Sequence, residues 1–176
     1  MWTMPPEWQL HTATWMGFPT SAYDTAGVSD DDVFDAWAQV ANTISEHEPV
    51  HMLCHPGQLT IAQKKLASAV TLHAFEIDDA WIRDSGPTFV TGEHGLGGVD
   101  WVFNGWGDHT AFDWSQDAKV ASHIIELTGA KRLGSDLVNE GGGIHVNGEG
   151  DVLLTRTVQL DPGRNPTATE DTVDVE

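Results

Sequence analysis

The sequence has very little cysteine: Cys54 is the only one among 176 residues. A single cysteine excludes an intrachain disulfide and a metal site built from several thiolates, and it is typical of proteins from reducing compartments. The N-terminus lacks a basic segment followed by an apolar core, and no apolar run is long enough to span a bilayer. These absences predict a cytoplasmic protein that makes no contact with a membrane.

Basic residues are also scarce, with 8 Lys and Arg against 27 Asp and Glu, for a formal net charge of -19. So few cations make a phosphate-binding surface improbable, and we expect no nucleic-acid partner. Acidic charge spread over helices and loops is typical of proteins that remain hydrated at high salt, where their self-repulsion is screened. An ordinary acidic cytosolic protein is the alternative.

The apolar residues are sufficient for a core, since 40% of the chain is hydrophobic and eight residues are tryptophan. Periodicity predicts an α/β fold with mixed sheets and covering helices. We expect residues 1–166 to form part of one domain and residues 167–176 to be an acidic, irregular end. Strands are expected near 12–18, 50–54, 72–77, 88–90, 99–103, 137–138, 143–146 and 152–154, and helices over 30–44, 56–69 and 115–128.

One short segment, residues 78–87, concentrates carboxylates, an arginine and an indole between two apolar runs. A polar turn held by strands on both sides is a common place for binding groups. A planar guanidinium pairs with carboxylates through parallel hydrogen bonds and interacts with the face of a tryptophan. The segment therefore predicts a cation-binding pocket that uses Asp78, Trp81 and Asp84.

A second acidic position, Glu140, precedes three consecutive glycines. Asp84 and Glu140 together can grip one guanidinium from two sides. The structural alternatives are that Arg83 pairs internally with a neighbouring acid, that Trp81 belongs to the core, and that the glycines form a tight turn or allow a close strand approach.

The histidines and the cysteine offer weaker candidates for chemistry. His51 and His55 stand four residues apart, but on a strand and turn, so a zinc site is the less favoured interpretation. His145 lies beside the glycines and is either a pocket residue or, more simply, a packed strand residue. Cys54 lies in an apolar run without an adjacent acid, which favours a buried structural thiol over a nucleophile.

Five segments stand out in this order: 4–8 (MPPEW), 13–16 (ATWM), 78–89 (DDAWIRDSGPTF), 104–107 (NGWG) and 140–150 (EGGGIHVNGEG). Together they resemble the agmatine-deiminase branch of the bacterial-type peptidyl-arginine deiminase family. The wider guanidine-modifying superfamily has a five-bladed α/β propeller fold, so the resemblance implies a partial propeller of this kind.

The resemblance implies hydrolysis of a guanidine without a cofactor. In the family, a cysteine thiolate attacks the guanidinium carbon, ammonia leaves, and water releases the ureido product, which is N-carbamoylputrescine when agmatine is the substrate. By this resemblance Asp84 holds the guanidinium nitrogens, Glu140 binds the other side and assists proton transfer, and Trp81 borders the pocket, with Asp78 as a further substrate-binding residue.

The resemblance covers only the first half of a full member. Full members carry a later Gly-His-x-Asp segment with the catalytic histidine and a His-Cys segment with the nucleophile, and neither is present in these 176 residues. We therefore predict no turnover by this chain alone. The alternatives are an arginine-type substrate, a noncatalytic half-propeller that binds cationic amines or a partner chain, and a metal hydrolase. A homo-oligomer or a complex with the missing C-terminal half is also expected, because a half-propeller exposes apolar edge strands.

Overall fold

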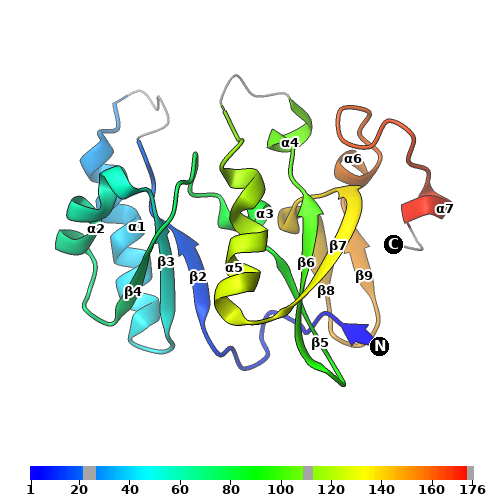
Figure 1. The fold of residues 1–176 in the computed structure, drawn as a ribbon, viewed down its shortest axis with the longest axis horizontal. Helices are drawn as coiled ribbons and strands as arrows, with labels where there is room; N and C mark the ends of the chain where they lie inside the picture. Colours follow the sequence, from blue (N-terminus) through cyan, green and yellow to red (C-terminus); the bar gives the residue numbers. More distant parts are fainter. Residues whose placement is uncertain (22–26, 109–112, 174–176) are drawn as a thin grey trace. The chain divides into compact units, whose positions relative to one another are not determined.

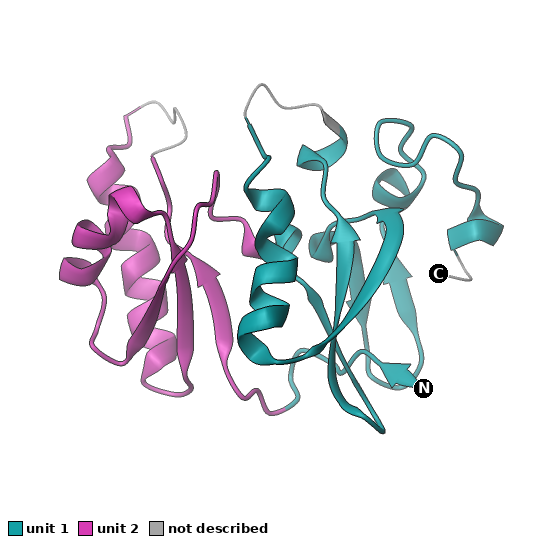
Figure 2. Ribbon diagram, in the orientation of Figure 1, with its two compact units in different colours: residues 1–9, 83–176 teal, residues 10–82 magenta. Residues whose placement is uncertain are grey.

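The protein divides into two compact units, which Figure 2 distinguishes by colour. The computed structural model describes residues 1–21, 27–108 and 113–173. Unit 2 comprises Leu10–Ile82, and unit 1 comprises Met1–Gln9 together with Arg83–Glu176. Both units combine helices with small sheets (Figure 1), so the mixed α/β class predicted from the sequence is confirmed.

Unit 2 is built on a three-stranded parallel sheet in the order β2-β3-β4. Met16 lies opposite Met52, which lies opposite Leu72, so the apolar side chains at these positions share one face. Helices make both crossovers, as parallel pairing requires. The elements in chain order are β2 (Thr14–Gly17), α1 (Asp30–Ser45), β3 (Val50–Cys54), η1 (Pro56–Gln58), α2 (Leu59–Lys65) and β4 (Val70–Ala74).

Helix α1 begins where the sequence predicts, because Ser29 and Asp32 form a capping box. The Asp32 N–H donates to Ser29 Oγ at 3.2 Å, and the Ser29 N–H donates to Asp32 Oδ2 at 3.0 Å. Each bond satisfies a backbone donor that the first helical turn leaves without a partner. The buried face of α1, which includes Phe34 and Ala41, packs with Phe18 and Met52 in the core of unit 2.

Two boundaries in unit 2 differ from the predictions. The helix expected over 56–69 is a 3-10 turn followed by α2, which ends at Lys65 because Leu66 has an extended backbone (ψ 143°). The strand expected over 72–77 is β4, which covers Val70–Ala74. Its pairing with β3 aligns Val50 with Val70, so sheet register, rather than the local apolar run, sets its start.

Unit 1 contains a four-stranded sheet in the order β1-β5-β6-β7. β5 and β6 form the predicted hairpin, with Gly92 opposite Gly95 at the turn. Helix α5 then leads to β7, which pairs with β6 in parallel. The elements are β1 (Trp2–Thr3), β5 (Thr88–Gly92), β6 (Gly95–Val102), η2 (Asp117–Lys119), α5 (Val120–Thr128) and β7 (Lys131–Val138).

Helix α5 ends as predicted, at Gly129, whose positive φ of 66° is the left-handed cap that glycine adopts without a Cβ penalty. Its start is later than expected, because η2 occupies 117–119. β7 is much longer than the predicted 137–138. Its first six residues were not predicted as a strand, because they include Lys131, Arg132 and Asp136 and lack an apolar alternation.

A second hairpin and several short helices complete unit 1. The hairpin pairs β8 with β9 in antiparallel fashion, as the sequence predicts. The acidic end predicted at 167–176 contains a four-residue helix over Glu170–Val173, and 174–176 lies outside the described residues. The remaining elements are α3 (Ile82–Ser85), α4 (Gly105–Asp108), η3 (Gly141–Gly143), β8 (Ile144–Val146), β9 (Val152–Leu154), α6 (Arg156–Gln159) and α7 (Glu170–Val173).

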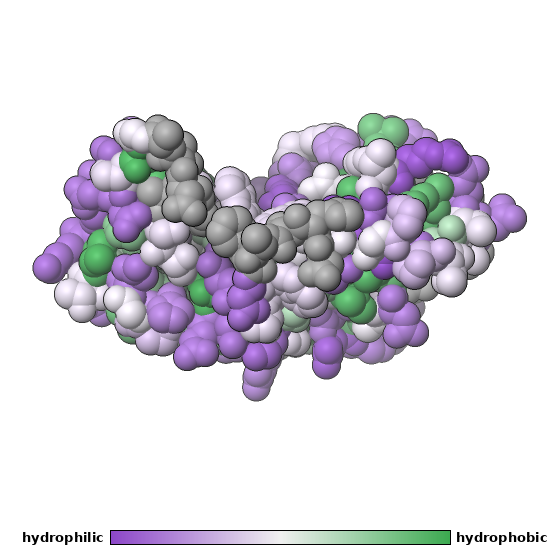
Figure 3. All heavy atoms as spheres, turned by 90° about the horizontal axis from the view of Figure 1, so that it is seen from above, coloured by the Kyte–Doolittle hydropathy of each residue, from purple (hydrophilic) through white to green (hydrophobic). Residues whose placement is uncertain are grey.

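The face in Figure 3 is dominated by polar residues with scattered apolar ones, in agreement with a formal net charge of -19. None of the helices in the described part of the chain is long and apolar enough to cross a membrane.

Candidate functional site

Asp84 lies on the short helix α3, and both of its carboxylate oxygens have a fixed donor. The backbone N–H of Gly142 donates to Oδ1 at 3.0 Å, and the indole Nε1–H of Trp106 donates to Oδ2 at 3.1 Å. These donors come from segments far away in the sequence, so folding of unit 1 sets the orientation of the carboxylate. A half-buried carboxylate held in this way is preorganised to accept hydrogen bonds from a cation.

The glycines after Glu140 are required by a close approach to this carboxylate. A Cβ on Gly142 would lie 2.5 Å from Asp84 Oδ1, and a Cβ on Gly141 would lie 2.3 Å from the backbone oxygen of Arg83. Both distances are shorter than side chains tolerate, so the glycines bring the segment after Glu140 directly against Asp84. The tight-turn alternative is therefore observed, since these glycines form the 3-10 turn η3. The turn lies in close approach to helix α3 and not to a strand.

Trp106 reaches Asp84 from a strained backbone. It has φ 61° and ψ 40°, a left-handed conformation that is rare for a bulky residue and costs about 1–3 kcal/mol. Gly105 leaves room for the Trp114 ring, since a Cβ there would lie 2.3 Å from it. The loop is also closed by the Gly107 N–H, which donates to Asn104 Oδ1 at 2.9 Å. The ring of Phe103 meets the Trp106 indole edge-on at 5.2 Å. This loop therefore holds the indole N–H on the carboxylate.

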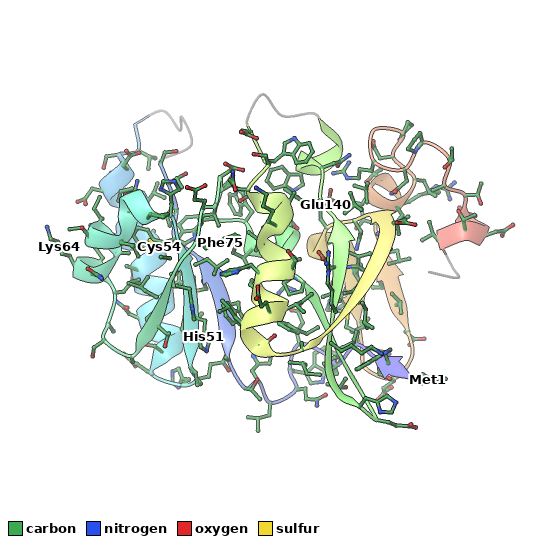
Figure 4. The ribbon with its side chains drawn as sticks, in the orientation of Figure 1. Met1, His51, Cys54, Lys64, Phe75 and Glu140 are labelled. Atoms are coloured by element: carbon green, nitrogen blue, oxygen red, sulfur yellow. The ribbon has the colours of Figure 1, made fainter. Side chains whose placement is uncertain are left out.

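Glu140 follows β7 (Figure 4). Its side chain is only 3% exposed. Its Oε1 accepts the Nε–H of Arg164 at 2.7 Å, and Arg164 Nη1 also lies 3.6 Å from Asp161. Burial raises the pKa of Glu140, and the charges of Asp84 and Asp161 add to that rise, while Arg164 opposes it. A carboxyl group with a raised pKa exchanges protons closer to neutral pH, which suits a general acid or base.

Arg164 is fixed by the chain around it. Asn165 Oδ1 accepts the Val138 N–H at 2.9 Å, and its Nδ2 donates to the Val138 oxygen at 2.8 Å. The segment that carries Arg164 is thus tied to the end of β7, one residue before Asn139 and two before Glu140. Arg164 was not predicted from the sequence. The Trp106 loop was noted only as one of the segments that resemble the family, and no role was predicted for it. Gly105 and Gly107, which flank Trp106, were the sequence signal that this loop has a left-handed backbone.

The structure brings Asp84 and Glu140 together in unit 1, and it places Asp78 and Trp81 in unit 2. The Asp78 backbone oxygen accepts the Thr20 hydroxyl at 3.0 Å. Trp81 is 45% exposed and meets the Trp37 ring edge-on at 5.9 Å, so the alternative that it is a core residue is wrong.

The other structural alternative concerned Arg83. Arg83 Nη1 pairs with Glu7 at 2.7 Å, and both side chains are largely exposed. An internal pair with a neighbouring acid of the 78–84 segment is therefore not the contact observed.

Cys54 is buried in the core of unit 2, on β3 (Figure 4). Burial raises the pKa of its thiol to about 11, so the thiolate is essentially absent at neutral pH. The structural interpretation of Cys54 is confirmed, and the residue is unsuited to nucleophilic attack.

The histidines form no metal cluster in the described residues. Across 1–21, 27–108 and 113–173, no group of three or more His, Cys, Asp or Glu side chains is arranged to hold a metal ion. His51 Nδ1 instead lies 2.8 Å from His73 Nε2, and Trp15 stacks on both rings. His145 is exposed on β8, so the expectation that it packs within the strand pair is wrong.

The sequence profile described as Porphyromonas-type peptidyl-arginine deiminase matches residues 3–176. The chain belongs to this family. Its resemblance to the family's agmatine-deiminase branch is also confirmed: a Streptomyces coelicolor protein named "Putative agmatine deiminase" is 50% identical over 180 residues, covering 98% of this chain and 52% of that protein. The corresponding Pectobacterium atrosepticum protein is 41% identical over 169 residues, covering 93% of this chain and 45% of its own length.

Solved structures of agmatine deiminases have the same fold as this chain over the part that it covers. The agmatine deiminase of Enterococcus faecalis superposes with a TM-score of 0.92 at 34% identity, covering 99% of this chain and 49% of that one. A second structure, titled as a putative agmatine deiminase, gives 0.91 at 37% identity with the same coverage. The chain spans about half the length of the relatives it matches, and it corresponds to their N-terminal portion.

Proposed function

We propose that this chain supplies one side of a guanidinium-binding site for the hydrolysis of agmatine to N-carbamoylputrescine and ammonia. The observation that carries the proposal is the pair formed by Asp84 and Glu140, in which Asp84 is held by two donors and Glu140 is buried beside it with a raised pKa. The names of the relatives support agmatine as the substrate.

The two carboxylates have different roles in this proposal. Asp84 is oriented by donors that leave lone pairs on both oxygens for guanidinium N–H groups, since each carboxylate oxygen accepts about two hydrogen bonds. Glu140 binds the cation from the other side and transfers protons as ammonia departs. Trp81 and Asp78 are proposed as further substrate-binding residues, on the resemblance alone.

The nucleophile is proposed to come from outside these 176 residues. Cys54 is excluded by its burial and its pKa of about 11. We therefore expect the purified chain to form no N-carbamoylputrescine above background. Turnover that persists in Cys54→Ala would contradict this part of the proposal.

The binding role is tested by calorimetric titration of the chain with agmatine at low salt. We expect weak binding that falls at least tenfold in Asp84→Asn and in Glu140→Gln, because a charge pair at 4 Å is worth about 4 kcal/mol at an effective dielectric of 20. Asp136→Asn is the matched control, since it removes the same charge from an exposed position on β7. Equal losses in all three variants would reduce the effect to net charge and refute a specific site.

Arginine serves as the comparison ligand, because it carries the same guanidinium and adds an α-carboxylate. If arginine binds at least as tightly as agmatine, the arginine-type substrate is the better assignment.

A further inference from the structure

The side chain of Arg164 is a nearly buried cation, with only 10% of its surface exposed. A guanidinium keeps its charge inside proteins, because its pKa lies above about 12. A charge that is taken out of water and left without a partner is strongly destabilising. The partner of Arg164 is the carboxylate of Glu140, whose Oε1 accepts the Nε–H at 2.7 Å. The stability of unit 1 therefore depends on keeping this cation paired.

The charge of Glu140 is not constant in the proposed function, on which this inference rests. Glu140 is neutral whenever it carries a proton, and it then no longer balances Arg164. A second carboxylate is placed for that state, since Asp161 Oδ1 lies 3.6 Å from Nη1 of Arg164. The Nε and Nη1 atoms of one guanidinium thus face two different carboxylates. The cation has an ionic partner in both protonation states of Glu140.

The turn that carries Arg164 also orients Asp161. Asp161 Oδ1 accepts the Gly163 N–H at 2.8 Å and the Arg164 N–H at 3.1 Å. The backbone oxygen of Asp161 accepts the Arg164 N–H at 3.0 Å and the Asn165 N–H at 2.7 Å. The carboxylate and the guanidinium therefore belong to one closed turn, residues 161–165, which sets their separation.

The 161–165 turn is attached on both sides to the end of β7 and the residue after it. On the exit side, the Asn165 side chain bonds to the backbone N–H and oxygen of Val138. On the entry side, Gln159 Nε2 donates to Asn139 Oδ1 at 2.5 Å, and both of these side chains are buried. A displacement of the turn would break these bonds, so the turn holds its guanidinium in place.

The contact with Arg164 distinguishes the two carboxylate oxygens of Glu140. Arg164 engages Oε1, and in the described part of the chain no donor forms a hydrogen bond with Oε2. A carboxylate oxygen accepts about two hydrogen bonds, so Oε2 keeps its full capacity to accept from a cation. Rotation of the carboxylate would carry Oε1 away from the Nε–H, and Arg164 therefore restrains that rotation.

We infer that Arg164 is a positioning residue, which holds Oε1 of Glu140 and so presents Oε2 to the guanidinium of the substrate. Asp161 is the second counter-ion of Arg164, and it balances the buried cation while Glu140 carries a proton. One proton is gained and lost at Oε2 of Glu140, and Arg164 and Asp161 keep their charges throughout.

The counter-ion arrangement is tested by the pKa of Glu140 in the full chain, measured by carbon NMR of its side-chain carboxyl group. The charged groups that face Glu140 are Arg164, Asp84 and Asp161. Arg164→Met removes the cation, so the pKa of Glu140 should rise by about one unit or more. Asp161→Asn removes a negative charge and keeps an oxygen that can accept the Gly163 N–H, so the pKa of Glu140 should fall.

Arg156→Met is the matched control, since it removes a cation of the same unit from an exposed position. The Arg156 side chain is 75% exposed and pairs with Glu170. We expect this variant to leave the pKa of Glu140 unchanged. Burial raises the pKa of Glu140, so a loosened structure alone would lower it. A rise in Arg164→Met is therefore a result that lost packing does not produce.

The positioning role is tested by Arg164→Lys, which keeps the charge but replaces the planar Nε and Nη1 fork with one ammonium nitrogen. We expect the pKa of Glu140 to stay closer to its original value than in Arg164→Met. The affinity for agmatine in calorimetric titration should fall roughly tenfold or more, the effect of losing a hydrogen bond to a charged group. Arg156→Lys is the corresponding control and should bind agmatine as the unchanged chain does.

An unchanged or lowered Glu140 pKa in Arg164→Met, or an equal rise in Arg156→Met, would overturn the counter-ion role of Arg164. An unchanged or raised pKa in Asp161→Asn would overturn the role of Asp161, and this variant decides even if Arg164→Met fails to fold. Full agmatine affinity in Arg164→Lys would overturn the positioning role. The pKa measurements use no agmatine. Opposite shifts in a chain that binds no agmatine would therefore refute the proposed function and leave the shared counter-ion standing.

Discussion

The contact between Gly142 and Asp84 can be tested by one added methyl group. In Gly142→Ala the Cβ would lie 2.5 Å from Asp84 Oδ1, while ordinary van der Waals contact begins at 3.4 Å. The oxygen must therefore move by about 0.9 Å, the difference between these distances. That movement breaks or distorts the 3.0 Å bond from the Gly142 N–H and displaces the carboxylate that accepts the Trp106 indole N–H.

The magnitude follows from two opposing effects. A hydrogen bond to a charged group contributes about 1.5–3 kcal/mol, and the lower end applies because Gly142 is exposed. Replacing glycine by alanine also restricts the unfolded chain, which stabilises the protein by about 0.4–1 kcal/mol. We expect Gly142→Ala to lower the free energy of unfolding by about 0.5–1 kcal/mol.

Gly134→Ala is the matched control for the effect on the unfolded chain. Gly134 lies on β7, and a Cβ there would meet no atom within 4 Å. The free energies of unfolding of the two variants, measured by urea denaturation, should differ by about 1.5 kcal/mol, since the effect on the unfolded chain cancels. The Trp106 indole N–H resonance should also shift in Gly142→Ala alone. Equal stabilities with an unmoved resonance would show that Gly142 makes no such close contact with Asp84.

Three further perturbations follow from the structure. Ser29→Ala removes the capping box of α1 and should cost ~1 kcal/mol of unfolding free energy in urea denaturation, whereas a stable variant would contradict the capping role. The pKa of Cys54 is raised from 9.0 to about 11, so unfolding exposes a thiol that ionises first; stability is retained below pH 9 and falls by up to ~3 kcal/mol as the pH rises to about 11. Cys54→Ala should lose that part of the pH dependence, and an unchanged profile would argue against the buried thiol. Because the net charge is -19, the melting temperature should rise with NaCl and not with equimolar sorbitol; equal effects would exclude charge screening.

Local sequence patterns predicted the elements that local physics determines. The capping residues before α1, the glycine turn between β5 and β6 and the left-handed Gly129 each act within a few residues. The sequence also indicated Asp84 and Glu140 as a pair, and the structure brings both into unit 1.

The remaining features depend on contacts between distant residues. Arg164 reaches Glu140 across 24 positions, and Trp106 reaches Asp84 across 22, so no local pattern assigns either role. β7 was largely missed because its charged residues are those of an edge strand, which lacks the apolar alternation on which strand prediction depends. The start of β4 is set by its register with β3.

We propose that Asp84 is part of a site for guanidinium rather than for any amine. Agmatine and putrescine differ in the guanidinium group, so the most direct measurement compares their effects on the Trp106 indole N–H resonance, whose acceptor is Asp84 Oδ2. We predict a saturable shift with agmatine, none with putrescine at the same concentration, and loss of the response in Asp84→Asn. Equal shifts with both amines, or no response to agmatine, would contradict the account.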